Sequence, residues 1–204
     1  MLRSVKIGPK FNYSMCMDSK RLFDIIISTL CFVVFAVPML LVAIAVKLTS
    51  PGSVLYWSKR VGKNNELFWM PKFRTMRIDT PVVATHLLSD PSRYLSPIGG
   101  FLRKTSLDEL PQLLCILKGD MSLVGPRPAL FNQEDLIAAR TAKGIDTLVP
   151  GLTGWAQVNG RDELPIPDKV AYDFEYLQRR GFFFDLHIML LTAIRVVRSH
   201  GVSH

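Results

Sequence analysis

A long apolar run near the start of the chain dominates its hydrophobic pattern. Residues Ile25 to Val46 are uncharged and mostly apolar, which is long enough for a helix to reach across a bilayer. Pro38 lies inside the run, where it removes a backbone donor and clashes with the carbonyl group four residues earlier. A bend is therefore predicted, and two arrangements stay open: a single spanning helix, and a re-entrant hairpin that returns both ends to one face. A cleavable signal peptide fits less well, because the run exceeds the usual length of its apolar region.

A turn cluster at residues 50–53, Ser-Pro-Gly-Ser, follows the apolar run. We expect this cluster to separate a membrane element from one compact domain. The predicted organisation is an N-terminal segment (1–19), a membrane element (20–49) and a single domain (50–204), since the remaining length is ample for one core.

Within the domain, the pattern predicts a β-hairpin and then mostly helices. The runs at 54–57 and 67–73 are β-branched or aromatic and surround a polar tip at 62–65, which is typical of a hairpin with a longer loop. Residues 77–92 contain many helix and strand breakers, so a loop is expected there.

Three helices are predicted farther along the chain. The first carries leucines at helical spacing and ends near Lys118 and Gly119, the second covers Asp168 to Arg180, and the third runs from Leu186 to Val197. The third has an apolar stripe, aromatic residues at its head and arginines near its end, so it fits either a membrane interface or the core of the domain. The leucines of the first helix are Leu110, Leu113, Leu114 and Leu117.

The net charge of the chain indicates an anionic partner. The formal net charge is +8, and basic residues flank the apolar run on both sides, which favours a negatively charged leaflet. Anionic lipids are therefore expected partners, and nucleic acid is not. The flanking residues are Lys20, Arg21, Lys47, Lys59 and Arg60.

Cysteine and histidine usage excludes two kinds of site. Cys16, Cys31 and Cys115 are odd in number and lack Cys-x-x-Cys spacing, and the four histidines are scattered. We therefore expect a reducing compartment, without a disulfide framework, a zinc site or a Ser/His/Asp triad.

Adjacent carboxylates at Asp108 and Glu109 are the main candidates for chemistry. Ser106 with Glu109, and Thr105 with Asp108, match helix-capping boxes, so capping and catalysis both stay open. Pro111 suits a helix that starts near Asp108. The helix N-terminus would then lower the pKa of Asp108 and keep it ionised, as a nucleophile requires.

Two glycine-rich segments could complete such a site. Residues 118–128 add Asp120 and Arg127 beyond the helix, so acids and a base together could hold a divalent cation and a phosphate. Residues 150–162 are rich in glycine and amides and include Arg161, which suits a nucleotide phosphate. The alternative for the second segment is a hairpin with Asn159 and Gly160 as its turn.

The motifs, taken in order, resemble those of a known family. The chain resembles the bacterial sugar transferases that act on polyprenyl phosphate, the monotopic phosphoglycosyl transferases, from Lys20 to its C-terminus, and it looks like their minimal form. The matching blocks are Lys20-Arg21-Leu22-Phe23-Asp24, Ser50-Pro51-Gly52, Arg60-Val61-Gly62, Lys72-Phe73-Arg74-Thr75-Met76, Leu102 to Gln112, Gly119 to Pro128, and Gly151 to Arg161.

The resemblance implies a reaction and roles for individual residues. In this family the aspartate of the Asp-Glu pair attacks the β-phosphate of a UDP-sugar, UMP leaves, and undecaprenyl phosphate then accepts the phosphosugar. Asp108 is the implied nucleophile, Glu109 the implied Mg²⁺ ligand, and Asp120 joins the metal shell or caps a helix. The implied phosphate and nucleotide contacts are Arg74, Arg103, Lys104, Arg127 and Arg161.

The implied fold class is α+β: a re-entrant membrane helix-hairpin and a small cytosolic catalytic domain of amphipathic or interfacial helices with a short β-hairpin. The family commonly breaks its membrane helix at a Ser-Pro pair, whereas here Val37 precedes Pro38. The bend is expected to persist without the serine hydrogen bond. The implied location is the cytosolic face of the bacterial inner membrane.

Substrate choice and assembly are less constrained by the sequence. Residues 154–161, 185–192 and 201–203 look most like family members that handle N-acetylated amino sugars, although glucose and galactose users share most of these motifs. A homodimer stays an open alternative. The rival functions are a membrane-tethered binding module without catalysis and a glycosyltransferase that releases UDP.

Overall fold

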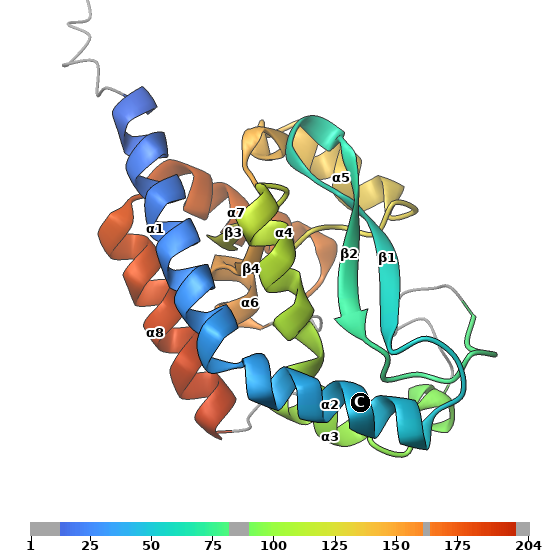
Figure 1. Cartoon of the computed structure of the whole chain (residues 1–204). Helices are drawn as coiled ribbons and strands as arrows, with labels where there is room; N and C mark the ends of the chain where they lie inside the picture. Colours follow the sequence, from blue (N-terminus) through green and yellow to red (C-terminus); the bar gives the residue numbers. More distant parts are fainter. Residues whose placement is uncertain (1–12, 82–89, 161–163, 199–204) are drawn as a thin grey trace, which may run out of the picture.

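The computed structural model describes residues 13–81, 90–160 and 164–198. Its architecture is mixed: helices pack around a short parallel sheet, and a β-hairpin lies at one side of the molecule (Figure 1). The α-helices are α1 (Tyr13–Val34), α2 (Ala36–Thr49), α3 (Gly99–Thr105), α4 (Leu113–Lys118), α5 (Glu134–Thr141), α6 (Trp155–Asn159), α7 (Ile166–Arg179) and α8 (Phe182–Arg198). The 3₁₀ turns are η1 (Lys63–Asn65), η3 (Pro91–Tyr94), η4 (Leu107–Gln112) and η5 (Ile145–Thr147).

The predicted bend in the apolar run is present. Helices α1 and α2 meet at an angle of 60°, and no single helix in the described residues has the length and hydropathy of a membrane span, although the bent pair does. The break falls at Phe35, three residues before Pro38. The proline thus occupies the first turn of α2, where its missing donor is not needed, and its clash with the carbonyl of Val34 separates the two helices.

The β-hairpin is confirmed and is longer than predicted. Strands β1 (Leu55–Val61) and β2 (Leu67–Phe73) pair antiparallel, with Val61 opposite Leu67. The tip is η1, where Asn64 and Asn65 adopt positive φ values of 53° and 61°, a conformation that asparagine tolerates better than most residues.

The alternative of a hairpin with Asn159 and Gly160 as its turn is wrong. Strand β4 (Gly151–Thr153) pairs parallel with β3 (Ser122–Val124), and α6 follows directly and ends at Asn159. A Cβ atom on Gly154 would lie 2.1 Å from the carbonyl oxygen of Gly125. The glycines of this segment therefore allow a close approach of two backbones, which the sequence alone did not distinguish from a turn.

The helices α4 and α7 confirm two predictions, with one change of face. Helix α4 ends at Gly119, which has a positive φ of 105°, and α7 ends one residue before the predicted limit. The buried face of α4 carries Leu113 and Ile116, whereas Leu114, one of the four predicted stripe residues, is 45% exposed. The short 3₁₀ turn before α4 shifts the register of the apolar stripe.

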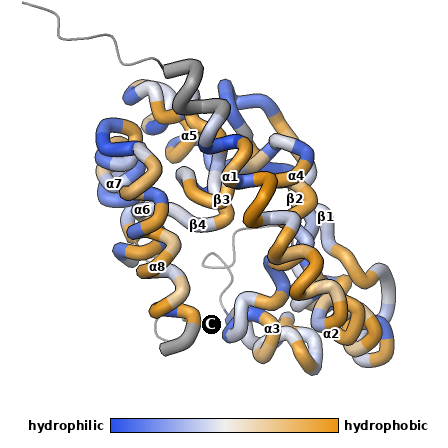
Figure 2. Tube along the Cα trace, turned by 60° about the vertical axis from the view of Figure 1, so that its left-hand side comes forward, coloured by the Kyte–Doolittle hydropathy of each residue, from blue (hydrophilic) through white to orange (hydrophobic). Residues whose placement is uncertain are grey.

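Helices α1 and α2 share hydrophobic cores with the rest of the described chain. Side chains of α1 pack against the main core, which includes Ile116, Met121 and Ile188. Val42 and Val46 of α2 form a second cluster with Phe73 and Leu102. Figure 2 shows that hydrophobic positions continue along much of α1 and α2, past the residues that these cores bury.

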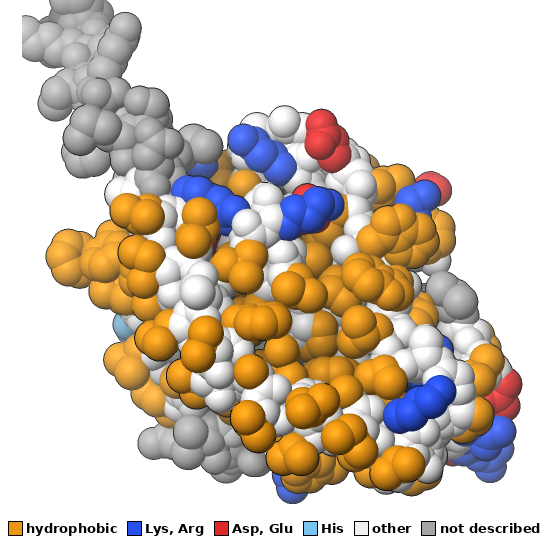
Figure 3. Space-filling model, in the orientation of Figure 1, with side chains coloured by type: hydrophobic (Ala, Val, Ile, Leu, Met, Phe, Trp, Pro, Cys, Tyr) orange, Lys and Arg blue, Asp and Glu red, His pale blue; other side chains and the backbone are white. Residues whose placement is uncertain are grey.

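The outward faces of α1, α2 and α8 are also apolar. Figure 3 shows hydrophobic side chains over most of one face of the molecule. On α8 the predicted stripe residues Leu186 and Leu190 are 37% and 59% exposed, so the core alternative for that stripe is wrong. The other exposed apolar residues on α1 and α2 include Leu22, Ile26, Leu30, Val33, Val37, Leu40, Leu41 and Ile44.

Candidate active site

A sharp reversal of the chain places Asp108 and Glu109 at the start of η4. Ser106, between α3 and η4, adopts a left-handed conformation with φ 58° and makes no side-chain capping bond. The Thr105 hydroxyl donates back to the carbonyl of Phe101 at 2.9 Å. Both predicted capping boxes are therefore wrong, and capping does not explain the two acids.

Glu109 is held by two cations from other elements. Lys72 of β2 and Arg127, which follows β3, both donate to its Oε1, at 2.7 and 2.9 Å. Burial by itself would raise the pKa of Glu109, but the charges and hydrogen bonds of Arg127 and Lys72 outweigh it and hold that pKa well below its usual range. Glu109 is therefore a fixed anion at the centre of the site.

Asp108 differs from its neighbour, because it is buried with only 7% exposure. Burial raises the pKa of Asp108 to about 6, against the opposing charges of Lys72 and Arg103. The predicted lowering of this pKa by a helix N-terminus is wrong. The segment that begins at Leu107 is a six-residue 3₁₀ turn, and so short an element has little dipole to offset burial.

The structure separates the predicted phosphate-binding residues into two groups. Arg103 lies near enough to Asp108 to act on its pKa, and its Nε donates to Thr75 at 3.0 Å. Arg127 contacts Glu109 directly. Lys104 is exposed on α3. Arg74 instead donates to Pro51 and Ser53 at 2.9 and 2.6 Å, so it holds the turn cluster that follows α2.

Arg161 and Asp120 are the two remaining predicted site residues. Arg161 lies outside the described residues. Asp120 lies beyond the far end of α4, about 15 Å along the η4–α4 segment from Glu109, and it pairs with Lys118 at 2.9 Å. Helix α4 lies between Glu109 and Asp120 in the chain, and a role of Asp120 in a metal shell stays a prediction. No cluster of three or more His, Cys, Asp or Glu side chains with metal-binding geometry occurs in the described part of the chain.

Lys72 is a functional candidate that the sequence reasoning missed. It contacts Glu109, its charge acts on Asp108, and burial lowers its own pKa. A usable signal was present: Lys72 is the only charged residue in an otherwise apolar strand, Leu67 to Phe73. A lysine in a buried strand needs an anionic partner.

The basic start of α1 also has a role that the sequence reasoning missed. Lys20 donates to Asp185 of α8 at 2.5 Å, and Arg21 donates to the carbonyls of Ile116 and Leu117 at 2.5 and 2.7 Å. These contacts join α1 to α8 and to the C-terminus of α4. Lys20 and Arg21 thus bind other parts of the protein, and contact of the basic flanks with anionic lipid stays a prediction.

Comparison with known proteins agrees with this geometry. A family model described as "Bacterial sugar transferase" matches residues 15–199. The chain belongs to the bacterial sugar transferase family. This transferase is 39% identical over 184 residues to "Uncharacterized sugar transferase EpsL" of Bacillus subtilis, covering 90% of each chain. The resemblance stated from the motifs is confirmed.

Other relatives of the transferase carry names that state a role. "Exopolysaccharide production protein ExoY" of Rhizobium meliloti is 36% identical over 199 residues, covering 90% of this chain and 87% of its own. "UDP-glucose:undecaprenyl-phosphate glucose-1-phosphate transferase" of Xanthomonas campestris pv. campestris is 38% identical over 190 residues. That match covers 88% of this chain and 39% of the relative's own length.

Proposed function

We propose that this transferase moves a sugar 1-phosphate from a UDP-sugar to undecaprenyl phosphate. The names of related family members support the overall reaction. The single structural observation that carries the mechanism is the unequal carboxylate pair. Glu109 is neutralised by Lys72 and Arg127, whereas Asp108 is buried beside it with a raised pKa. A desolvated carboxylate next to clustered cations is suited to attack a phosphate.

The chemistry proceeds in two displacements at one phosphorus. In the first, a carboxylate oxygen of Asp108 bonds to the β-phosphorus of the donor, the bond to the bridging oxygen breaks, and UMP leaves. In the second, an oxygen of undecaprenyl phosphate attacks the same phosphorus, and the carboxylate of Asp108 is restored. The phosphosugar is thereby linked to the lipid through a diphosphate, and one site serves both substrates in turn.

Arg127 and Arg103 would bind the phosphates of the donor. Each lies beside the acid pair, and a guanidinium group binds phosphate oxygens in a planar, two-pronged manner. The same role for Lys104 and Arg161 rests on their motif positions.

The acid pair also fits Mg²⁺. This ion usually takes one or two protein carboxylates and completes its shell with water and substrate phosphates, so two adjacent acids are a sufficient protein contribution. Glu109, and Asp108 before it reacts, would hold the ion. When bound, Mg²⁺ offsets charge on the diphosphate and on the departing UMP. The fixed anionic state of Glu109 supports its role as the ligand.

The location we propose is the cytosolic face of the bacterial inner membrane, with α1 and α2 entering the bilayer as a re-entrant pair. The 60° bend and the exposed apolar faces of α1, α2 and α8 support it. Anionic headgroups would contact the basic residues around these faces, such as Lys47.

For the sugar, we propose an N-acetylated amino sugar, on the motif likenesses of residues 154–161 and 185–192. The named relatives that specify a sugar act on glucose, so UDP-glucose belongs in every comparison. The released nucleotide is measured for each UDP-sugar in turn, with undecaprenyl phosphate and Mg²⁺ in nanodiscs.

The decisive measurement on the reaction is which nucleotide is released. UMP release that depends on Mg²⁺, together with a mass increase of one phosphosugar on Asp108 when the acceptor is omitted, supports the proposal. Asp108→Asn is expected to abolish both signals. Asp120→Asn, which removes an acid far from the pair, serves as the matched control and is expected to retain them.

Other outcomes separate the rival functions. Release of UDP would identify an ordinary glycosyltransferase. Binding to anionic vesicles without release of any nucleotide would favour a membrane-tethered binding module. Normal activity in Asp108→Asn would overturn the assignment of the nucleophile.

A further inference from the structure

Arg127 sits in a loop that has few backbone donors of its own. Pro126 and Pro128 flank it, and neither has an N–H group, so the loop depends on its carbonyl oxygens for hydrogen bonds. Pro126 accepts from the backbone of Gly151 at 2.9 Å, and Pro128 accepts from the Arg60 side chain at 3.2 Å. The carbonyl of Arg127 itself accepts from Arg140 Nη1 at 2.8 Å.

Arg140 is in turn fixed by a buried acid. Its Nε and Nη2 donate to Asp173 Oδ2 at 2.9 and 2.6 Å, and the two residues are only 8% and 1% exposed. Arg140 belongs to α5 and Asp173 to α7. The Arg140 guanidinium therefore joins α5 and α7 to the backbone of Arg127, whose side chain contacts Glu109.

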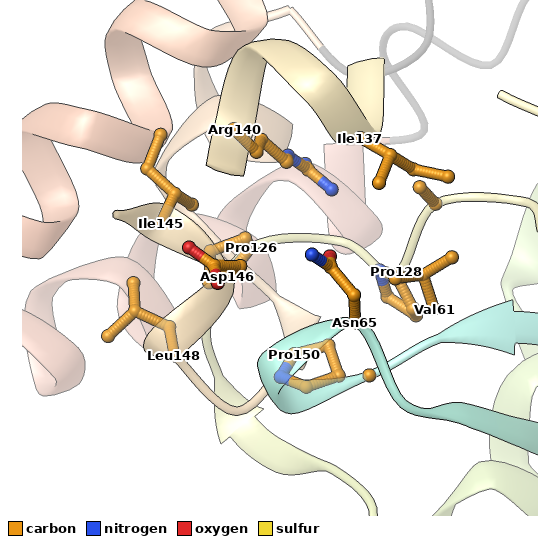
Figure 4. A pocket seen from close by; sticks show the side chains of 12 residues that line it. Val61, Asn65, Pro126, Pro128, Ile137, Arg140, Ile145, Asp146, Leu148 and Pro150 are labelled. Carbon is orange, nitrogen blue, oxygen red and sulfur yellow. The ribbon is translucent and has the colours of Figure 1, made fainter. Parts of the chain in front are cut away.

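Arg140 contacts the backbone of the loop, whereas the Arg127 side chain contacts Glu109. In Figure 4 the Arg140 guanidinium extends from α5 toward the part of the chain that carries Pro126 and Pro128. The cavity on this side is about 30 Å³, and Arg140, Pro126 and Pro128 all line it. That volume has room for a water molecule or two and is far too small for a nucleotide sugar. Arg140 thus contacts the Arg127 loop and not a bound donor.

We propose that Arg140 and Asp173 are positioning residues, which hold the Arg127 loop so that Arg127 meets both Glu109 and the donor phosphate. This inference rests on the proposed function, in which Arg127 binds that phosphate. A buried ion pair is a weak source of stability compared with apolar residues of similar size. Its geometry, however, fixes orientation, and a displacement of about 1 Å at a reacting centre costs on the order of 100-fold in rate.

The experiment replaces both Arg140 and Asp173 with apolar residues, because removing one charge alone would leave the other buried and unpaired. The double variant Arg140→Met with Asp173→Leu fills the space but donates nothing to the carbonyl of Arg127. We expect kcat/KM for UMP release to fall by about 10- to 100-fold while the melting temperature is retained. Glu175→Gln, on the same helix as Asp173, is the matched control and is expected to keep wild-type activity.

A double-mutant cycle separates positioning from general support of the fold. In an Arg127→Ala background the double variant is expected to cause little further loss, since the residue being positioned is gone. A full additional loss would overturn the proposal, and so would wild-type activity of the double variant. If the double variant does not fold, Arg140→Lys replaces it. A lysine keeps the charge opposite Asp173 but cannot bridge both partners, so it is expected to show the same loss and the same dependence on Arg127.

Hydrogen–deuterium exchange provides a readout that does not depend on the reaction. The peptide that covers residues 122–130 is expected to exchange at least tenfold faster in the double variant, with unchanged exchange in α1 and α4. Unchanged exchange in residues 122–130 would overturn the positioning role. A wild-type protein that releases no UMP from any donor would contradict the proposed function alone, and this exchange comparison would still decide the role of Arg140 and Asp173.

Discussion

The two acids of the site are adjacent in sequence and differ in what surrounds them. Glu109 is an anion held by two cations, whereas Asp108 ionises only against the cost of its burial. This difference supports the separate roles that we propose for two adjacent carboxylates. It also means that the ionised carboxylate of Asp108 destabilises the folded protein.

Asp108→Asn is therefore expected to stabilise the protein at neutral pH. The pKa of Asp108 is about 6 in the folded protein against an ordinary value of 3.8, so ionisation penalises the folded state at pH values above about 6. The neutral amide escapes this penalty, with a gain on the order of 1–3 kcal/mol at pH 8. The gain should shrink as the pH falls from about 6 to about 4, where the carboxyl group becomes protonated in the folded and then in the unfolded state.

Denaturant unfolding in detergent at pH 8 and at pH 4.5 measures this effect. Asp120→Asn, whose carboxylate pairs with Lys118 at the surface, is the control. An equal change in unfolding free energy at both pH values would contradict a raised pKa of Asp108.

Lys72→Met is expected to impair the reaction through Glu109. The substitution keeps the volume of the side chain but removes one of the two cations on Oε1, so Glu109 loses orientation and Asp108 loses a favourable charge. We expect kcat/KM for UMP release to fall by about 10- to 100-fold. Lys63→Met, at the tip of the β-hairpin, is the matched control. A loss of similar size in both variants would show that the effect is not specific to the site.

At the scale of elements, helix ends position the site. The η4 turn, which holds the acid pair, leads directly into α4. The last carbonyls of α4 accept hydrogen bonds from Arg21 and from the backbone of Gly119. Strand β3 begins three residues after Gly119, at Ser122, and leads to Arg127. The geometry of this single helix end therefore connects the acids to the arginine that meets them.

Gly119→Ala is expected to destabilise the protein by about 1–2 kcal/mol. Gly119 has a φ of 105°, and an added Cβ would meet nothing closer than 3.5 Å, so the cost comes from backbone strain. Gly100→Ala, inside α3 and with its nearest contact at 3.8 Å, is the control and is expected to be neutral or stabilising by up to about 1 kcal/mol. Melting temperatures of the two variants test this pair. A destabilised Gly100→Ala with an unaffected Gly119→Ala would refute the argument.

Elements with a strong local pattern could be predicted, and contacts between distant segments could not. The β-hairpin, α7 and the stop at Gly119 follow from periodicity and turn residues. The parallel pairing of β3 with β4 depends on a close backbone approach at Gly125 and Gly154, which leaves no periodic signal. Likewise, the acid pair was found from its motif, but its partner Lys72 lies far from it in sequence, as does Arg140, which contacts the backbone of Arg127. The pKa of Asp108 depends on burial that only packing determines.

At the scale of the whole molecule, the bent pair α1–α2 is the part of the chain that we propose enters the membrane. A re-entrant pair keeps the N-terminus and the catalytic domain on the same side. A membrane-impermeant maleimide should then label a Ser53→Cys variant, and a protease should remove an N-terminal tag, both from the cytosolic face of inverted vesicles. Access from opposite faces would contradict the re-entrant arrangement.

Pro38→Ala is expected to weaken this arrangement. Alanine restores a donor at that position and removes the clash with the carbonyl of Val34, so a straighter helix becomes accessible. Part of the population should then place its N-terminal tag on the far side in the same vesicles. Val37→Ala, which leaves the proline in place, is the control. An unchanged tag position in Pro38→Ala would show that other contacts maintain the bend.

The contacts of α1 with the domain have a consequence for how the protein is made. Because α1 packs on the main core and Arg21 binds the last carbonyls of α4, we expect the domain to complete its folding only when this helix has docked. A fragment of residues 50–204 is therefore expected to be degraded rapidly in cells, and co-expression of residues 1–49 should prolong its lifetime in a pulse-chase experiment. Biogenesis at the membrane would then serve as a checkpoint, which withholds a finished catalytic centre from any chain that has not reached its lipid.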